Sequence, residues 1–327
     1  MASEPEARSQ KPEARSQGRR DAGSDTVSEL APLSLATDVE ELLARAWVSR
    51  LANWPAEITA SLPVDTLPVS VTGRACALGC AHCGGHYLGG MKTLDEARRS
   101  AAPSFLVSGG CDERGRVPVS QHLEALGALL AGRRGNWHLG LVEDEELGKL
   151  RPLLDVVSFD FVGDDGTLRE VYGLTASADD YERCFARLAA QVPVVPHVTI
   201  GLRGGKIGHE WAALERLSRY PLTSLVLLVL IPTPGTRYAE VEPPPLPEVA
   251  CLLAEARLRF PRTSVQLGCM RPRGAYREAL DVLAVRAGLN VMVNPTRAAY
   301  AAARERGLEW RTHYECCVFA PRPIAGS

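Results

Sequence analysis

The chain is predicted to fold as an α/β protein of the (β/α)8 TIM-type barrel class. Short apolar strands alternate with amphipathic helices from residue 67 to residue 306. Strict alternation of this kind favours a parallel sheet with both faces covered. Eight strand–helix units match the number in a complete barrel. Because such barrels carry their functional groups at the carboxyl ends of the strands, the residues that end each strand are the candidate site.

The elements follow from periodicity and from their end signals. Runs rich in Val, Ile and Phe indicate strands, whereas apolar residues spaced three or four apart indicate helices. Thr93 is a predicted helix cap and Gly288 a predicted helix stop. The expected strands are residues 69–72, 104–108, 137–141, 155–162, 194–202, 224–231, 263–268 and 290–294. The expected helices are residues 94–101, 120–132, 144–150, 178–191, 210–220, 246–260, 275–288 and 296–306.

Four regions are expected along the chain. Residues 1–38 are predicted to be a disordered tail, because PEARSQ occurs twice in a charged segment with few large apolar residues. Residues 39–66 are predicted to be a helical leader and a proline-containing linker. The barrel is expected to occupy residues 67–306. Residues 307–327 are predicted to be a cysteine-containing extension over the barrel top.

The composition argues against several classes of protein. The 327 residues carry a net charge of −2, which gives no reason to expect a nucleic acid or an acidic membrane as a partner. No apolar run approaches the roughly 20 residues of a membrane helix, and no signal-peptide core is present. The nine cysteines are spaced too unevenly for a small disulfide scaffold. We therefore expect a cytoplasmic protein with free thiols.

Cys76, Cys80 and Cys83 form a C-x3-C-x2-C motif directly after the first expected strand. The glycine-rich residues that follow favour a tight loop. A closed zinc site needs four ligands, and the motif has one C-x2-C pair. A 4Fe-4S cluster usually takes four thiolates, so three would leave one iron open for a substrate or cofactor. A zinc loop and a redox C-x2-C site are the alternatives.

This motif resembles the signature of the radical S-adenosylmethionine (SAM) superfamily. The resemblance implies that Cys76, Cys80 and Cys83 hold a 4Fe-4S cluster whose open iron chelates SAM. Reduction would then cleave SAM to a 5'-deoxyadenosyl radical. His82 stands where the superfamily usually has an aromatic residue, and its planar ring is expected to lie against the adenine.

Other strand ends resemble the SAM contacts of the superfamily. Ser108 ends the second strand, and the Gly-Gly motif after it implies that the backbone binds the methionine amino group of SAM. Ser158 and Asp160 share one face of the fourth strand and resemble a pair that holds the ribose. A hydrogen-bonded layer inside the barrel is the structural alternative for these polar side chains. The remaining cofactor-binding candidates are Gly109, Gly110, His197, Thr199 and Gly201.

Four further cysteines are candidates for a second iron–sulfur cluster. Cys111 ends the second strand and Cys269 the seventh, and the ends of both strands lie on one barrel rim. A thiol of Cys316 or Cys317 in the extension would complete the set. Unrelated, scattered thiols are the alternative. Two more cysteines are expected to be buried core residues: Cys184 and Cys251.

Residues 67–318 resemble the archaeal-type two-component lipoyl synthase, in the biotin synthase-like branch of the superfamily. The matching segments are 69–73, 82–85, 268–272 and 316–317. The resemblance implies insertion of sulfur into a protein-bound octanoyl chain from a sacrificial auxiliary cluster. It also implies three partners: a homologous second subunit, an octanoylated lipoyl carrier or H protein, and an electron donor such as ferredoxin or flavodoxin.

Arg271 is expected to pair with the SAM carboxylate or with the substrate, and a structural ion pair is the alternative. Two other functions remain open for the chain. One is a single-cluster radical SAM mutase or cofactor maturase that inserts no sulfur, in which Cys111, Cys269 and the tail cysteines are dispensable. The other is a metal-binding accessory protein without catalytic activity.

Overall fold

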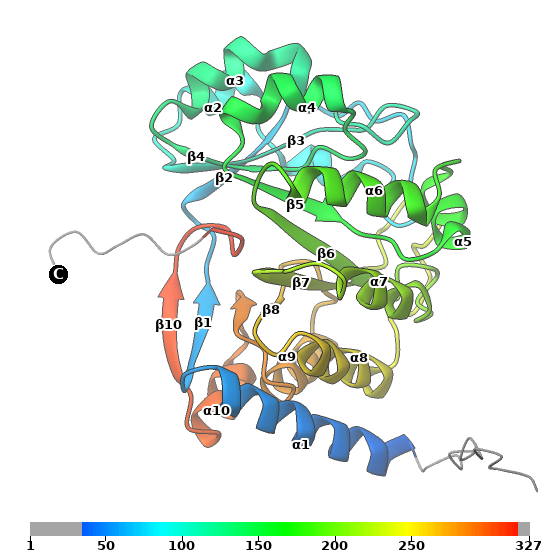
Figure 1. The fold of residues 1–327 in the computed structure, drawn as a ribbon, viewed down its shortest axis with the longest axis vertical. Helices are drawn as coiled ribbons and strands as arrows, with labels where there is room; N and C mark the ends of the chain where they lie inside the picture. Colours follow the sequence, from blue (N-terminus) through cyan, green and yellow to red (C-terminus); the bar gives the residue numbers. More distant parts are fainter. Residues whose placement is uncertain (1–34, 320–327) are drawn as a thin grey trace, which may run out of the picture. The chain divides into compact units, whose positions relative to one another are not determined.

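A curled sheet of ten parallel strands organises residues 35–319, the part of the chain that the computed structural model describes (Figure 1). Its strand order is β10-β1-β9-β8-β7-β6-β5-β4-β3-β2. The strands are β1 (Glu57–Ser61), β2 (Thr66–Ser70), β3 (Ser104–Ser108), β4 (Arg134–Trp137), β5 (Val156–Asp160), β6 (Val194–Ile200), β7 (Ser224–Val229), β8 (Ser264–Leu267), β9 (Val291–Val293) and β10 (Glu309–His313).

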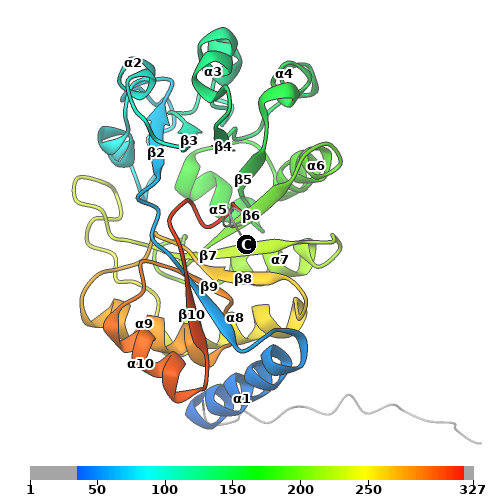
Figure 2. The same ribbon diagram turned by 90° about the vertical axis from the view of Figure 1, so that its left-hand side faces the viewer.

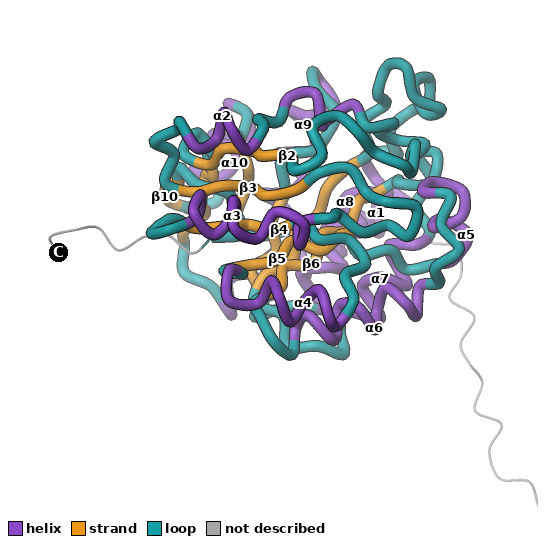
Figure 3. The backbone as a smooth tube through the Cα atoms, turned by 90° about the horizontal axis from the view of Figure 1, so that it is seen from above, coloured by secondary structure: helices purple, strands orange, loops and turns teal. Residues whose placement is uncertain are grey.

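The helices lie outside the curled sheet (Figure 3). They are α1 (Leu35–Asn53), α2 (Leu94–Arg98), α3 (Leu123–Leu130), α4 (Asp144–Leu150), α5 (Asp165–Thr167), α6 (Ala178–Ala189), α7 (His209–Leu217), α8 (Leu246–Arg259), α9 (Ala275–Arg286) and α10 (Arg297–Glu305). Short turns of other helix types are η1 (His86–Gly90), η2 (Val119–His122), η3 (Arg151–Leu153) and η4 (Leu168–Tyr172). No helix in this range combines the length and the apolarity that crossing a bilayer requires.

The predicted parallel α/β fold is confirmed, but the prediction of eight strands is wrong. The expected linker contains β1, and the expected extension contains β10. Residues 62–65 separate β1 from β2, and yet β1 pairs with β9 and β10 whereas β2 pairs with β3. The chain therefore passes from one end of the strand order to the other. The strand β1 was missed because prolines flank its five residues.

Two helix-end signals behave as predicted. Thr93 accepts a hydrogen bond from the backbone N–H of Glu96, whose carboxylate accepts one from the Thr93 N–H at 2.8 Å. Gly288 follows α9 with a φ of +76°. Along the leader, α1 begins at Leu35, four residues before the expected helix. The rest of the predicted tail, residues 1–34, lies outside the described residues.

The two faces of the sheet bury different residues. On β5, Val157 and Phe159 point outward into the main core beneath the helices, whereas Val156 points inward. Full burial of such a side chain contributes roughly 1.5–3 kcal/mol. On the inner face, Val156 packs with Val195, Val226 and Phe319. The inner face therefore has its own small apolar cluster, which the C-terminal segment completes.

The C-terminal segment does not cover the top of the barrel as predicted. After β10 the chain turns toward β5 and β6 (Figure 2), and Phe319 reaches residues in the amino-terminal halves of β5, β6 and β7. The backbone of Tyr314 accepts a hydrogen bond from the Asp65 N–H at 2.9 Å. This placement follows from β10, which pairs with β1 and delivers the chain to the start of β2. Residues 320–327 lie outside the described part of the chain.

Candidate active site

The motif cysteines lie in the loop that follows β2, at the carboxyl end predicted for them. The last residue of that strand and a residue two positions later shape the loop. Ser70 Oγ donates to the Gly73 carbonyl at 2.7 Å, and Thr72 Oγ1 donates to the Ala75 carbonyl at 2.9 Å. We call residues 71–85 the cysteine loop. Its three thiols are Cys76, Cys80 and Cys83.

Three separate parts of the chain hold the cysteine loop through its backbone. The Ala77 N–H donates to the Cys111 carbonyl at 2.8 Å, which joins the loop to the end of β3. The Ala81 N–H donates to the Val171 carbonyl at 2.7 Å, and the Ala81 carbonyl accepts from the Tyr238 N–H at 3.0 Å. These bonds join it to η4 and to the segment after β7. The loop is therefore fixed by tertiary contacts as well as by its own turns.

The Gly-Gly motif after β3 lies directly against the cysteine loop. A Cβ on Gly110 would sit 1.9 Å from the Ala75 carbonyl oxygen and 2.6 Å from the Cys76 Cα. A Cβ on Gly109 would meet Thr72 Oγ1 at 3.1 Å. The Gly110 N–H donates to that same Thr72 oxygen at 2.7 Å. Glycine is thus required at position 110 by close approach of two backbones. Binding of SAM there stays a prediction.

Two of the motif thiols shift each other's pKa. The neighbouring Cys80 thiol lowers the pKa of Cys83 to about 4, and Cys83 together with burial raises the pKa of Cys80. His82 also lowers the pKa of Cys83. The neighbouring Cys111 differs, because burial raises its pKa to about 12, with further contributions from Cys76 and Asp160. The cysteine loop therefore presents a thiolate, which is the form that binds metals.

The cysteine loop supplies the type of donor that the predicted cluster would need. A 4Fe-4S cluster binds each thiolate on a different iron, and Cys76, Cys80 and Cys83 are three free thiols on one loop. Among residues 35–319, no three His, Cys, Asp or Glu side chains converge as ligands of one metal ion would. Binding of a cluster there stays a prediction.

The carboxyl ends of β4 and β5, together with the middle of β6, add a polar group. Asp160 ends β5 with its side chain 56% exposed, and its Oδ2 lies 3.9 Å from His138 Nδ1. The rings of His138 and His197 are 5.9 Å apart, and His197 Nδ1 lies 3.0 Å from the Val195 carbonyl. Burial lowers the pKa of His138, and it lowers the pKa of His197 to about 4, so both rings are neutral at neutral pH.

Sequence reasoning missed His138 and Asn136. The expected strand began at Trp137, whereas β4 ends there, so His138 lies at a carboxyl end. Asn136 and His138 alternate along the chain as Ser158 and Asp160 do, and this signal would have identified them. Ser158 Oγ donates to Asn136 Oδ1 at 2.7 Å, which orients the amide of Asn136 toward Cys316 Sγ at 3.4 Å. Ser158 is therefore hydrogen-bonded inside the sheet, as the structural alternative to ribose binding predicted.

Of the remaining cofactor-binding candidates, two have neighbours that the sequence did not predict. His82 packs edge-on against Tyr172 with ring centroids 5.5 Å apart. Gly201 has a φ of +72°, and a Cβ there would lie 2.7 Å from Pro244. Two candidates keep their predicted place on the inner side of the strands, and their role in binding stays a prediction: Ser108 and Thr199.

The other predicted ligands divide into two groups. Cys269 follows β8 and retains an exposed surface, although burial and the nearby Cys316 raise its pKa. The neighbouring Cys317 thiol lowers the pKa of Cys316 to about 7, whereas Cys316 and burial raise the pKa of Cys317. Cys111 was expected to join these three. Its backbone bond to the cysteine loop and the charges of Cys76 and Asp160 place it with the motif thiols instead.

Arg271 is held in a buried ion pair, so the structure favours the structural alternative over a role in catalysis. Its side chain is 1% exposed and its Nε donates to Asp281 Oδ1 at 2.8 Å. The same guanidinium donates to the Gly268 carbonyl at 2.7 Å and to the Asn294 carbonyl at 3.3 Å. Reaching SAM would require breaking these bonds and leaving a buried carboxylate unpaired.

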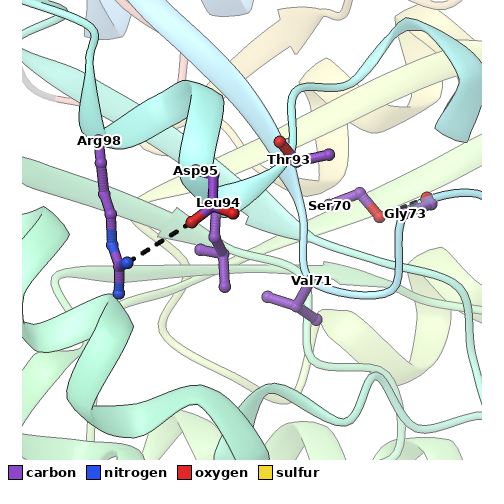
Figure 4. Close-up of a pocket in the computed structure, with 7 residues that line it drawn as sticks. All are labelled: Ser70, Val71, Gly73, Thr93, Leu94, Asp95 and Arg98. Carbon is purple, nitrogen blue, oxygen red and sulfur yellow. Dashed lines mark hydrogen bonds and ion pairs between the residues drawn. The ribbon is translucent and has the colours of Figure 1, made fainter.

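Two further cysteines lie in or against the main core, and one pocket lies beside the start of the cysteine loop. Cys184 is buried in the main core as predicted, and Cys251 packs partly buried against it. A shallow pocket of about 270 Å³ lies between α2 and the end of β2 (Figure 4). Its lining contains no thiol. The lining residues are Ser70, Val71, Gly73, Thr93, Leu94, Asp95 and Arg98.

No family model and no curated protein sequence matches the chain. Solved structures do match. The structure of methylornithine synthase (PylB) has a TM-score of 0.61 at 14% identity, and the match covers 85% of this chain and 91% of that one. For the FeFe-hydrogenase maturase HydG the TM-score is 0.62 at 16% identity, over 80% of this chain and 62% of that one. HydG from Carboxydothermus hydrogenoformans has a TM-score of 0.57 at 14% identity, over 85% and 76%. At these identities the likeness establishes a shared fold.

Proposed function

We propose that this chain is a radical SAM enzyme that inserts sulfur into a protein-bound octanoyl chain, as one subunit of a two-component lipoyl synthase. One observation carries the proposal: cysteine side chains occupy two separate places on the curled sheet. The first is the cysteine loop, and the second is formed by Cys269, Cys316 and Cys317. The fold supports the superfamily, because the matching structures are those of radical SAM enzymes.

Within this proposal, each residue group has a defined task. Cys76, Cys80 and Cys83 would hold the SAM-binding 4Fe-4S cluster, and the second thiol group would hold the auxiliary cluster. When bound, the two clusters supply the electron that cleaves SAM and the sulfur that is inserted. Gly110 lets the end of β3 approach the cysteine loop, so the loop is held rigidly. Asp160, exposed beside the neutral His138, is free to accept hydrogen bonds from the ribose of SAM.

The proposed partners follow from the same reaction. The substrate is an octanoyl chain on a lipoyl carrier or H protein, and ferredoxin or flavodoxin supplies electrons. A homologous second subunit is the third proposed partner, because the resemblance is to a two-component enzyme.

A second candidate function is a single-cluster radical SAM mutase or maturase. The observation that favours it is the fold shared with methylornithine synthase and with HydG. In that case the second thiol group would bind no cluster. A non-catalytic accessory protein is a third possibility, and it would cleave no SAM at all.

The deciding experiment measures iron and acid-labile sulfide per chain after anaerobic reconstitution. The wild type is compared with two triple variants, Cys76/Cys80/Cys83→Ala and Cys269/Cys316/Cys317→Ala. We expect about eight irons in the wild type and about four in each variant. Cys184→Ala is the matched control, because that thiol is buried in the main core, and it should keep about eight.

The alternative functions give different results. About four irons in the wild type and none in the first variant would leave a single-cluster enzyme. Incubation of the reconstituted chain with SAM and dithionite then separates an enzyme from an accessory protein, since only an enzyme releases 5'-deoxyadenosine. Thiolation of an octanoylated carrier, with the second subunit present, tests the substrate.

A further inference from the structure

The C-terminal segment that carries Cys316 and Cys317 is tied to the inner face of the sheet at several points. Ser61 Oγ donates to the Glu315 carbonyl at 3.0 Å, and the Cys316 N–H donates to Thr66 Oγ1 at 2.8 Å. The chain then turns tightly, because the Phe319 N–H donates to the Cys316 carbonyl at 3.0 Å. This turn brings the residues on either side of the cysteine pair close to β4.

One side chain of β4 contacts both flanks of that turn. Arg134, the first residue of β4, donates from Nε to Glu315 Oε1 at 3.2 Å and pairs through Nη2 with Oε2. The centre of the same guanidinium lies 4.6 Å from the centroid of the Phe319 ring. Glu315 precedes the cysteine pair and Phe319 follows it. One guanidinium therefore contacts the residue before the cysteine pair and the residue two positions after it.

The chemistry of this contact explains why the segment enters the sheet. Glu315 is 5% exposed and Phe319 is 6% exposed. A carboxylate removed from water to this extent needs a charged partner with matching geometry. Arginine offers a fork that binds both oxygens and a flat face that stacks on an aromatic ring, and lysine offers neither.

We propose that Arg134 is a positioning residue that holds Cys316 and Cys317 on the inner face of the sheet, in place to bind metal beside Cys269. The placement of the thiols stands on the contacts above, and their use as cluster ligands rests on the function proposed in the preceding section. Arg134 itself touches no cofactor in this proposal, since it acts through Glu315 and Phe319.

The first test is the rate at which iodoacetamide alkylates each cysteine in the metal-free, full-length protein, followed by peptide mass spectrometry. In Arg134→Met the rates at Cys316 and Cys317 should rise at least about tenfold, because one anchor of the segment is lost. Glu315→Gln should give a rise in the same direction. Arg134→Lys should fall between Arg134→Met and the wild type.

One reference cysteine and one control variant distinguish release of the segment from general unfolding. Cys184, 2% exposed in the main core, should react at the wild-type rate in every variant. Arg133→Met is the matched control, since Arg133 faces the other side and lies 5.4 Å from the Phe105 ring. Unchanged rates at Cys316 and Cys317 in both Arg134→Met and Glu315→Gln would overturn the proposal. So would an equal rise at Cys184.

Iron content after reconstitution tests separately whether the positioned thiols bind metal. Arg134→Met should keep the irons of the cysteine loop and lose about four of about eight. If the wild type itself holds only about four irons, the proposed function fails, and the alkylation rates still decide whether Arg134 positions the segment. Faster alkylation together with a full iron content in Arg134→Met would refute the link between positioning and metal binding.

Discussion

Replacing Gly110 by alanine tests whether the end of β3 supports the cysteine loop. The added Cβ would lie 1.9 Å from the Ala75 carbonyl oxygen and 2.6 Å from the Cys76 Cα. Both are backbone atoms, so the loop would have to retreat by roughly 1.5 Å to restore ordinary contact. Overpacking of this kind costs about 1–3 kcal/mol. For a domain of this size, that corresponds to a fall in Tm of roughly 2–5 °C.

The assay combines urea unfolding of the metal-free chain with iron content after reconstitution. Gly110→Ala should lower the free energy of unfolding and also reduce the iron bound by the motif thiols, because the retreat displaces Cys76. Gly148→Ala is the matched control, since its Cβ would meet nothing within 4 Å on α4. We expect that change to stabilise the helix by about 0.5 kcal/mol and leave iron unchanged. A Gly110→Ala protein with wild-type stability and wild-type iron would refute the reasoning.

Three further changes have defined outcomes. Thr72→Val removes two hydrogen bonds that hold the cysteine loop and should cost about 1–3 kcal/mol in urea unfolding, whereas Thr72→Ser should stay near the wild type. Arg271→Met should cost about 3–5 kcal/mol because Asp281 remains buried and unpaired, and Arg271→Met/Asp281→Leu should recover most of it. A fully stable but inactive Arg271→Met would instead place that residue in the chemistry. Burial lowers the pKa of His197 from 6.5 to about 4, so the unfolded chain binds more protons in that interval. The free energy of unfolding should therefore rise by about 3 kcal/mol as the pH increases from about 4 to 6.5. Urea unfolding at each pH measures this rise, and His197→Gln should reduce it. An equal slope in that variant would contradict the assignment.

The sequence alone determined the features that depend on local pattern. The alternation of apolar strands and amphipathic helices predicted the parallel α/β fold, because side-chain period reports which face of an element is buried. The helix cap at Thr93 was predicted because a cap and the helix it precedes are adjacent in the chain. The spacing of Cys76, Cys80 and Cys83 placed three thiols on one loop after a strand. None of these depends on how distant segments pack.

The tertiary structure alone decided where distant residues meet. The strand β1 inserts between β9 and β10, so the C-terminal segment reaches the inner face of the sheet rather than its top. Cys111 lies with the cysteine loop because a backbone bond joins β3 to that loop. Arg271 is buried on Asp281, and Arg134 contacts Glu315 from 181 residues away in the chain. Pairings of this kind depend on which strands neighbour one another and on the desolvation of each charge, and neither is encoded in local periodicity.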